Sequence, residues 1–246
     1  MRKILVLLII ATFLVSIPLA SASSGPPLNK IVFVYREGFA KPPGTPGKGG
    51  GGGEEFYEFL GRSVKWKDLP VNYVIDPDNP DGLPETFVVE AISNGAEEWN
   101  EHTSAELFGT YTVVYDATFD TDSPDDKNEL LFGDYPEEGV IAVTVIWGYF
   151  YGPPGQRKII EFDIMFDIDF SWGDAGLTSE SELGDTSIMD LQNIATHELG
   201  HAAGLADLYN DQASEQTMYG YAAYGETKKR TLNTGDIAGI QALYGA

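Results

Sequence analysis

The chain has 246 residues, of which 43% are hydrophobic and 12% aromatic, so it can bury one good core and a single structured domain is the simplest expectation. Its formal net charge of −23 excludes nucleic acid as a partner, because the phosphates would be repelled. The absence of cysteine excludes disulfides and a lipid anchor on a cysteine at the cleavage point.

The amino terminus has the pattern of a secretory signal. Arg2 and Lys3 precede an apolar run over residues 4–17, and the small residues at 20–22 follow it. The run is too short to cross a bilayer comfortably, so no membrane anchor is expected after cleavage. We therefore predict a signal peptide over residues 1–22 and a secreted, extracellular protein, which we expect to be a monomer.

Residues 23–63 have little capacity to form a core. Residues 31–35 fit one short strand, but a stretch rich in proline and glycine follows and ends in an unbroken glycine run at 49–53. This composition is typical of a flexible linker that proteases reach easily. The segment is either a tether, which the composition slightly favours, or a short pro-segment.

The remaining residues, 64–246, have the pattern of one α/β domain of the α+β type. A strand over residues 71–75 leads through a turn-rich loop into a helix over 85–102, whose apolar residues repeat at helical spacing. Runs of β-branched and aromatic residues predict further strands. These strands cover residues 110–115, 130–132, 140–147 and 159–166.

The run from His197 to Asp207 reads HExxHxxGxxD and carries the strongest signal. In a helix, positions 197 and 201 lie about 40° apart, so His197 and His201 can reach one metal ion. Glu198 falls just beside that face, where its carboxylate can act as general base on a water without binding the metal. The pattern favours a zinc-dependent hydrolase.

A catalytic zinc usually has three protein ligands, so a third must be found. Gly204 can adopt the left-handed conformation that ends a helix and turns the chain back. The chain has three histidines, and the one outside the motif, His102, falls at the end of the predicted first helix, where solvent exposure is expected. Asp207 is therefore the economical candidate.

The segment before the motif should supply the rest of this helix. Ser187 and Asp190 resemble a capping pair, which predicts that the helix begins near residue 187. Apolar residues then recur at helical spacing and should pack on the core, which would hold the histidines in place. These are residues 188, 191, 194 and 195.

Several motifs in the same order resemble the matrixins, a family of metzincin zinc peptidases. Besides HExxHxxGxx, residues 214–220 look like the methionine turn, with Met218 expected beneath the metal. Residues 163–172 are similar to the matrixin segment DIHFDxDExW, and residues 235–245 to the C-terminal helix. The resemblance spans residues 64–246. It implies a mixed twisted sheet, a long helix, an active-site helix, a Met-turn and a C-terminal helix.

The same resemblance implies the chemistry. The chain would be a secreted zinc endopeptidase acting on protein or peptide substrates, with Zn²⁺ held by His197, His201 and Asp207 and with Glu198 as general base. A substrate would lie antiparallel to an edge strand near residues 140–147, adding itself to the sheet.

The departures from the family are specific. Matrixins have a third histidine where this chain has Asp207, and an aspartate there is similar to snapalysin-type peptidases, in which it is taken as a zinc ligand. Met165 replaces a histidine of the family's structural zinc site, so that second zinc is not expected. Asp167 could still bind Ca²⁺ as in the family, whereas Phe170 cannot do so through its side chain. The inhibitory propeptide cysteine of matrixins is impossible here.

Two further acidic clusters are candidates for Ca²⁺, although solvated loops are the favoured interpretation of both. They are Asp76, Asp78 and Asp81, and then Asp120, Asp122, Asp125 and Asp126. Two other functional interpretations stay open. One is a secreted, non-catalytic metal-binding or surface protein on a metzincin-like fold. The other is a peptidase whose third ligand is a downstream glutamate, Glu215 or Glu226, as in gluzincins.

Overall fold

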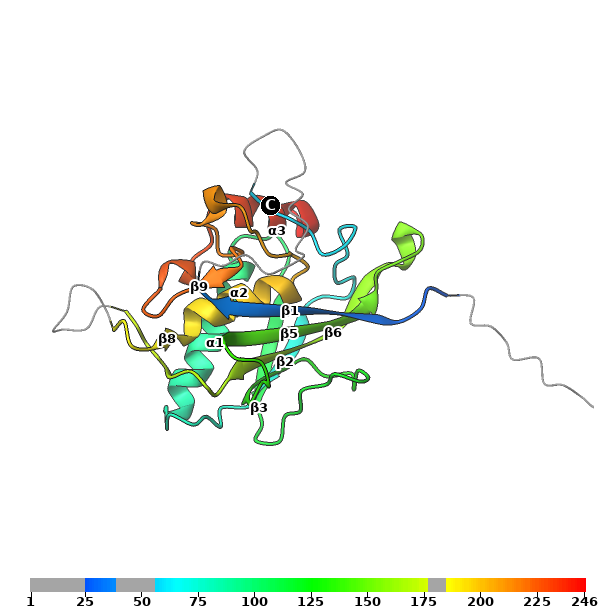
Figure 1. Cartoon of the computed structure of the whole chain (residues 1–246). Helices are drawn as coiled ribbons and strands as arrows, with labels where there is room; N and C mark the ends of the chain where they lie inside the picture. Colours follow the sequence, from blue (N-terminus) through cyan, green and yellow to red (C-terminus); the bar gives the residue numbers. More distant parts are fainter. Residues whose placement is uncertain (1–24, 39–55, 177–184) are drawn as a thin grey trace, which may run out of the picture.

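The computed structural model describes residues 25–38, 56–176 and 185–246, and within them seven strands form one mixed sheet. The spatial order of these strands is β3-β2-β4-β6-β5-β1-β9 (Figure 1). In chain order they are β1 (Asn29–Glu37), β2 (Val71–Ile75), β3 (Phe108–Val113), β4 (Glu129–Gly133), β5 (Val140–Tyr149), β6 (Lys158–Asp167) and β9 (Tyr221–Ala222). A separate short pair joins β7 (Trp172–Gly173) to β8 (Met189–Asp190) in parallel.

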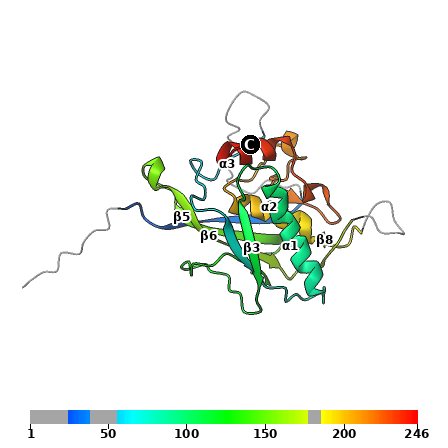
Figure 2. The same ribbon diagram turned by 180° about the vertical axis from the view of Figure 1, so that it is seen from behind.

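Two helices, α1 (Glu85–Asn100) and α2 (Leu191–Ala202), pack against each other beside the sheet (Figure 2). The Nε1 of Trp99 donates to the carbonyl of Thr196 at 2.8 Å, and a Cβ at Gly95 would lie 3.1 Å from the Thr196 nitrogen. The absence of a side chain at Gly95 therefore lets α1 approach the helix that carries the HExxH motif. The last helix, α3 (Thr234–Tyr244), lies above α2 in Figure 1.

The predicted elements are confirmed in kind, with shifts at their ends. The strand predicted over residues 71–75 matches β2. The helix predicted to reach residue 102 ends at Asn100, and the strand predicted from residue 110 begins at Phe108. In the part of the chain that the structure describes, no helix is long and apolar enough to cross a membrane.

The predicted start of the zinc-motif helix is wrong. The helix begins at Leu191, and Asp190 is its N-cap, accepting a hydrogen bond from the Asn193 nitrogen at 2.9 Å. Ser187 instead bonds the side chain of Asp185. The cap lies three residues further on because residues 189–190 are still extended in β8, paired with β7, and the Asp190 carboxylate is held there by the guanidinium of Arg230.

Strand β1 is longer than the short strand predicted from residues 31–35, and it belongs to the main sheet. It pairs antiparallel with β5, from Asn29 opposite Gly148 to Arg36 opposite Val140. At its far end Arg36 and Glu37 pair in parallel with β9 (Figure 1). The prediction of an open edge at residues 140–147 is therefore wrong, because β1 covers that edge of β5.

Candidate metal centre

The turn at the end of α2 places the third member of the predicted metal site. Gly204 has a φ of +106°, and a Cβ there would lie 2.7 Å from the carbonyl oxygen of Val64. Only glycine meets both conditions without strain. The chain therefore reverses directly after the helix and returns Asp207 to the face of α2 that carries His197 and His201.

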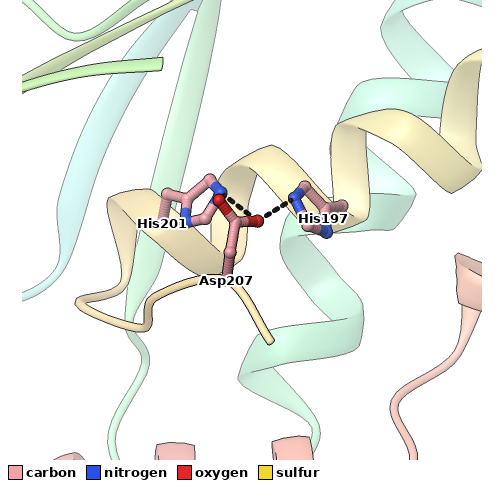
Figure 3. A group of neighbouring side chains, drawn as sticks. All are labelled: His197, His201 and Asp207. Carbon is pink, nitrogen blue, oxygen red and sulfur yellow. Dashed lines mark ion pairs between the residues drawn. The ribbon is translucent and has the colours of Figure 1, made fainter. Parts of the chain in front are cut away.

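The structure brings the three predicted ligands together (Figure 3). The Oδ1 of Asp207 lies 3.3 Å from Nε2 of His197 and 3.4 Å from Nε2 of His201. Tetrahedral zinc with bonds of about 2.0–2.1 Å separates its ligand atoms by about 3.3–3.4 Å. Both distances from Asp207 Oδ1 therefore match tetrahedral zinc, and all three ligand atoms lie within 4.8 Å of one another.

The backbone sets the orientation of both imidazoles. The Nδ1 of His197 lies 2.7 Å from the carbonyl of Thr217, and the Nδ1 of His201 lies 3.0 Å from the carbonyl of Leu205. A carbonyl can only accept, so each Nδ1 carries a proton, and Nε2 is the ring atom on the side of Asp207 that can coordinate a metal ion. The Nε2 of His197 and the Oδ1 of Asp207 are buried without a hydrogen-bond partner, which fits two atoms that would coordinate a metal ion.

The electrostatics of the cluster also suit a cation. Burial lowers the pKa of His197 to about 4, which keeps this imidazole neutral and able to coordinate. Burial raises the pKa of Asp207, but the two histidines outweigh burial and hold that pKa well below its usual range. Burial lowers the pKa of His201, but Asp207 outweighs burial and raises that pKa, so a metal ion would have to displace a proton from His201. Neutral imidazole and ionised carboxylate are the forms that bind zinc.

Glu198 lies next to this cluster and is held at one oxygen. The Oγ1 of Thr144, on β5, donates to Oε2 of Glu198 at 2.5 Å, while Oε1 is buried with no partner. Burial raises the pKa of this carboxyl to about 7. One oxygen is therefore fixed by the sheet, and the other is free to accept a proton from a reacting group.

Met218 lies against the middle of the motif helix, as the Met-turn pattern predicts. It is buried, and a Cβ at Gly200 would lie 2.2 Å from its sulfur. The backbone nitrogens of Thr217 and Met218 donate to the carboxylate of Asp236 at the start of α3. This network holds the carbonyl of Thr217, which orients His197.

The sequence did not reveal that two aromatic rings of β1 cover the cluster. The ring of Phe33 stacks on His201 and the ring of Tyr35 stacks on His197, each with centroids 3.8 Å apart. Residues 31, 33 and 35 are apolar or aromatic and share one face of a strand, which was the available signal. Nothing in this apolar run identified His197 and His201 as the residues it covers.

The other sequence candidates lie elsewhere. His102 forms an ion pair with Glu98 at 3.4 Å, Glu215 pairs with Lys228, and Glu226 pairs with the buried Lys229. Among the described residues, the only groups with metal-ligand spacing that contain the motif histidines are completed by Asp207. The gluzincin alternative is therefore wrong.

The predicted acidic clusters have different outcomes. Asp76, Asp78 and Asp81 do not form a group with metal-ligand spacing among the described residues. Of the second cluster, Asp120 and Asp125 form such a group with Glu129, whereas Asp122 and Asp126 join none. Asp120 also groups with Glu161 and Asp163, and the Oδ1 of Asp163 and Oδ2 of Asp120 are buried without a partner. Asp167 groups with Asp134 and Asp169, whereas Phe170 packs in the core near Tyr224.

A mixed sheet, a helix with two histidines and a glutamate, a glycine turn and a buried methionine beneath the helix together define the metzincin class of metallopeptidases. Comparison with known families matches residues 65–245 to the family described as Matrixin. The chain belongs to the matrixin family, whose members are zinc metalloendopeptidases. Strand β1 lies outside the matched residues.

Similar proteins come from plants and animals. The chain is 29% identical to Metalloendoproteinase 2-MMP of Arabidopsis thaliana over 181 aligned residues. These residues cover 72% of this chain and 41% of that protein. It is 31% identical over 205 residues to Stromelysin-1 of Mus musculus, which covers 82% of this chain and 36% of that protein. The chain thus spans well under half the length of either relative.

Proposed function

We propose that this protein is a secreted zinc endopeptidase in which His197, His201 and Asp207 hold the metal and Glu198 is the general base. The observation that carries this proposal is that Nε2 of His197 and Nε2 of His201 lie 3.3 and 3.4 Å from Asp207 Oδ1, beside an unpartnered oxygen of Glu198. A zinc ion there would activate water and polarise the scissile carbonyl. Protein and peptide chains are the substrates that membership of a peptidase family implies.

The residues around the centre would move one proton. Glu198 Oε1 accepts it from the water that adds to the carbonyl carbon, and the same oxygen returns it to the amine when the carbon–nitrogen bond breaks. Thr144 keeps the carboxylate aimed during both transfers, because its hydroxyl holds Oε2. The backbone carbonyls of Thr217 and Leu205 keep both imidazoles in the coordinating tautomer.

The function is tested by incubating the purified, zinc-loaded chain with a denatured protein, with and without a chelator, and identifying the products by mass spectrometry. The same assay is run after a site-specific protease, whose recognition sequence replaces residues 49–53, has cut the chain. We expect internal cleavages that the chelator abolishes. Zinc bound to the cut chain without any cleavage would favour the non-catalytic alternative.

We also propose that residues 23–63 act as a pro-segment rather than as a plain tether. Support comes from β1, which occupies the strand position that a substrate would need beside β5 and stacks Phe33 and Tyr35 on the two histidines. Phe33 lies opposite Thr144 in the register, so the strand passes directly over the residue that holds Glu198. A peptide cannot enter this position while β1 is in place.

Weakening β1 should therefore activate the uncut chain. In a Phe33→Ala variant the stacking on His201 is lost, which removes about 2 kcal/mol of contact and should raise peptide hydrolysis by about tenfold or more. Val32→Ala is the matched control, since Val32 is 42% exposed. The rise is measured as the initial rate of hydrolysis of a fluorogenic peptide. Equal rates for wild type and Phe33→Ala would contradict the pro-segment role.

We propose that Asp120, Glu161 and Asp163 form a Ca²⁺ site that stabilises the fold. Burial raises the pKa of Asp163 to about 8 and of Glu161 to about 7, and the neighbouring carboxylates add to both shifts, so a cation there would stabilise the ionised forms. Calcium at about 100 times its Kd should add roughly 2.7 kcal/mol and raise the melting temperature by roughly 5–10 °C. Asp163→Asn should abolish this rise in a thermal melt, whereas Asp122→Asn should keep it.

A further inference from the structure

The side chain of Tyr35 fills a closed pocket next to the metal centre, and we call this space the Tyr35 pocket. Strand β1 runs antiparallel to β5 and parallel to β9, so its backbone is held on both sides at the end where Tyr35 lies. A substrate strand would use the same two partners once β1 has left. The residue that such a substrate places where Tyr35 now lies must enter the same pocket.

One wall of the Tyr35 pocket is His197. The two rings are stacked with an interplanar angle of 4°, and Tyr35 is only 1% exposed. The phenol oxygen lies 3.4 Å from the carbonyl of Tyr219, to which it donates. The pocket therefore accepts a flat ring and receives the polar end of that ring at its far side.

Lys229 closes that far side. It lies in the short 3-10 helix η3 (Lys228–Arg230) and is fully buried, with its backbone nitrogen bonded to the side chain of Asn193 at 2.7 Å. Its ammonium donates to the hydroxyl of Tyr35 at 2.5 Å. The same ammonium donates to the carbonyl of Tyr221 and pairs with Glu226 at 2.9 Å.

An ammonium has three N–H donors, and these three partners use all of them. The carbonyl of Tyr221 and the carboxylate of Glu226 belong to the pocket, and the third partner is the phenol oxygen of Tyr35, which fills it. A phenylalanine in the same place would leave one N–H of a buried cation without an acceptor. Sites built to bond a hydroxyl discriminate strongly against analogues that lack it.

We propose that the Tyr35 pocket is a specificity pocket that selects tyrosine side chains of substrates through Lys229. This inference rests on the proposed peptidase function and adds the residue class that the substrate must carry. Strand β1 then silences the enzyme by presenting the side chain that the pocket prefers. The closeness of Tyr35 to His197 places the selected residue immediately beside the bond that is cut.

The first test uses the wild-type, zinc-loaded full chain. Products from a denatured protein should show tyrosine enriched at one fixed position relative to the cut. Two peptides that differ only there, tyrosine against phenylalanine, should then compete with a kcat/KM ratio of about tenfold or more. This ratio is independent of the fraction of molecules in which β1 has left the cleft. Cleavage without a preference for tyrosine overturns the inference but leaves the peptidase function intact. No cleavage of any peptide, by the full chain or by the chain cut at residues 49–53, overturns both.

Two variants test the role of Lys229. In Lys229→Met the preference for tyrosine should fall to about equality while the phenylalanine peptide is still cut, and Lys228→Met, an exposed neighbour, should keep the wild-type ratio. An unchanged ratio in Lys229→Met overturns the assignment. If that variant does not fold, Tyr35→Phe gives an independent readout, because it weakens the hold of β1 and should raise the activity of the uncut chain about tenfold. No rise would contradict the role of the hydroxyl.

Discussion

In a Glu198→Gln variant, peptide hydrolysis should fall by at least about a hundredfold while zinc stays bound. Glutamine has the same shape and can keep the hydrogen bond to Thr144, but its amide cannot take a proton from water. The three proposed ligands are untouched, so the metal content should not change. Rates on a fluorogenic peptide and zinc content by atomic absorption measure the two quantities separately.

Glu90→Gln is the matched control, because Glu90 lies exposed on α1 and should keep wild-type activity. Two results would contradict the assigned role. Substantial activity in Glu198→Gln would remove Glu198 as general base. Loss of zinc in that variant would mean that Glu198 helps to hold the metal instead.

An Asp207→Ala variant should lose zinc during dialysis, with an affinity reduced by more than about a hundredfold. Loss of a residue that only orients a ligand costs about 10–100-fold, and Asp207 supplies a donor atom itself, 3.3 Å from His197 Nε2 and 3.4 Å from His201 Nε2. The variant leaves two imidazoles that cannot retain the ion alone. Zinc content after dialysis against a graded series of chelator concentrations gives the affinity.

A control variant and a rescue variant accompany this measurement. Asp211→Ala removes a nearby carboxylate outside the cluster and should leave zinc affinity unchanged. Asp207→His restores a third imidazole and should recover much of the binding. Unchanged zinc content in Asp207→Ala would contradict the assignment of Asp207 as the third ligand.

The arrangement of the three proposed ligands was largely predictable because its geometry is local. Helical spacing alone brings positions 197 and 201 to one face, and Gly204 marks the turn that returns Asp207. The helix start was less predictable, because Asp190 rather than Ser187 is the cap and the choice depends on Arg230, forty residues away. Local sequence contains no sign of that contact.

The strand β1 and the Tyr35 pocket depend on pairings over long sequence distances. The β-branched and aromatic run at residues 31–35 predicts a strand but does not identify its partner, and β5 lies more than a hundred residues later. Lys229 stands in a run of three basic residues, which in a sequence is typical of a solvated surface. Its burial follows from Asn193, Glu226 and the carbonyl of Tyr221, which converge only in the folded chain.

The long pairing between β1 and β5 also bears on solubility. Strand β5 is almost entirely buried over ten residues and is rich in valine and isoleucine. A flat apolar strand with free backbone N–H and C=O groups is a template for edge-to-edge aggregation. While β1 occupies that edge, the newly made chain presents no such template there. The strand that we propose to be part of a pro-segment would thus also cover an aggregation-prone edge for as long as it stays in place.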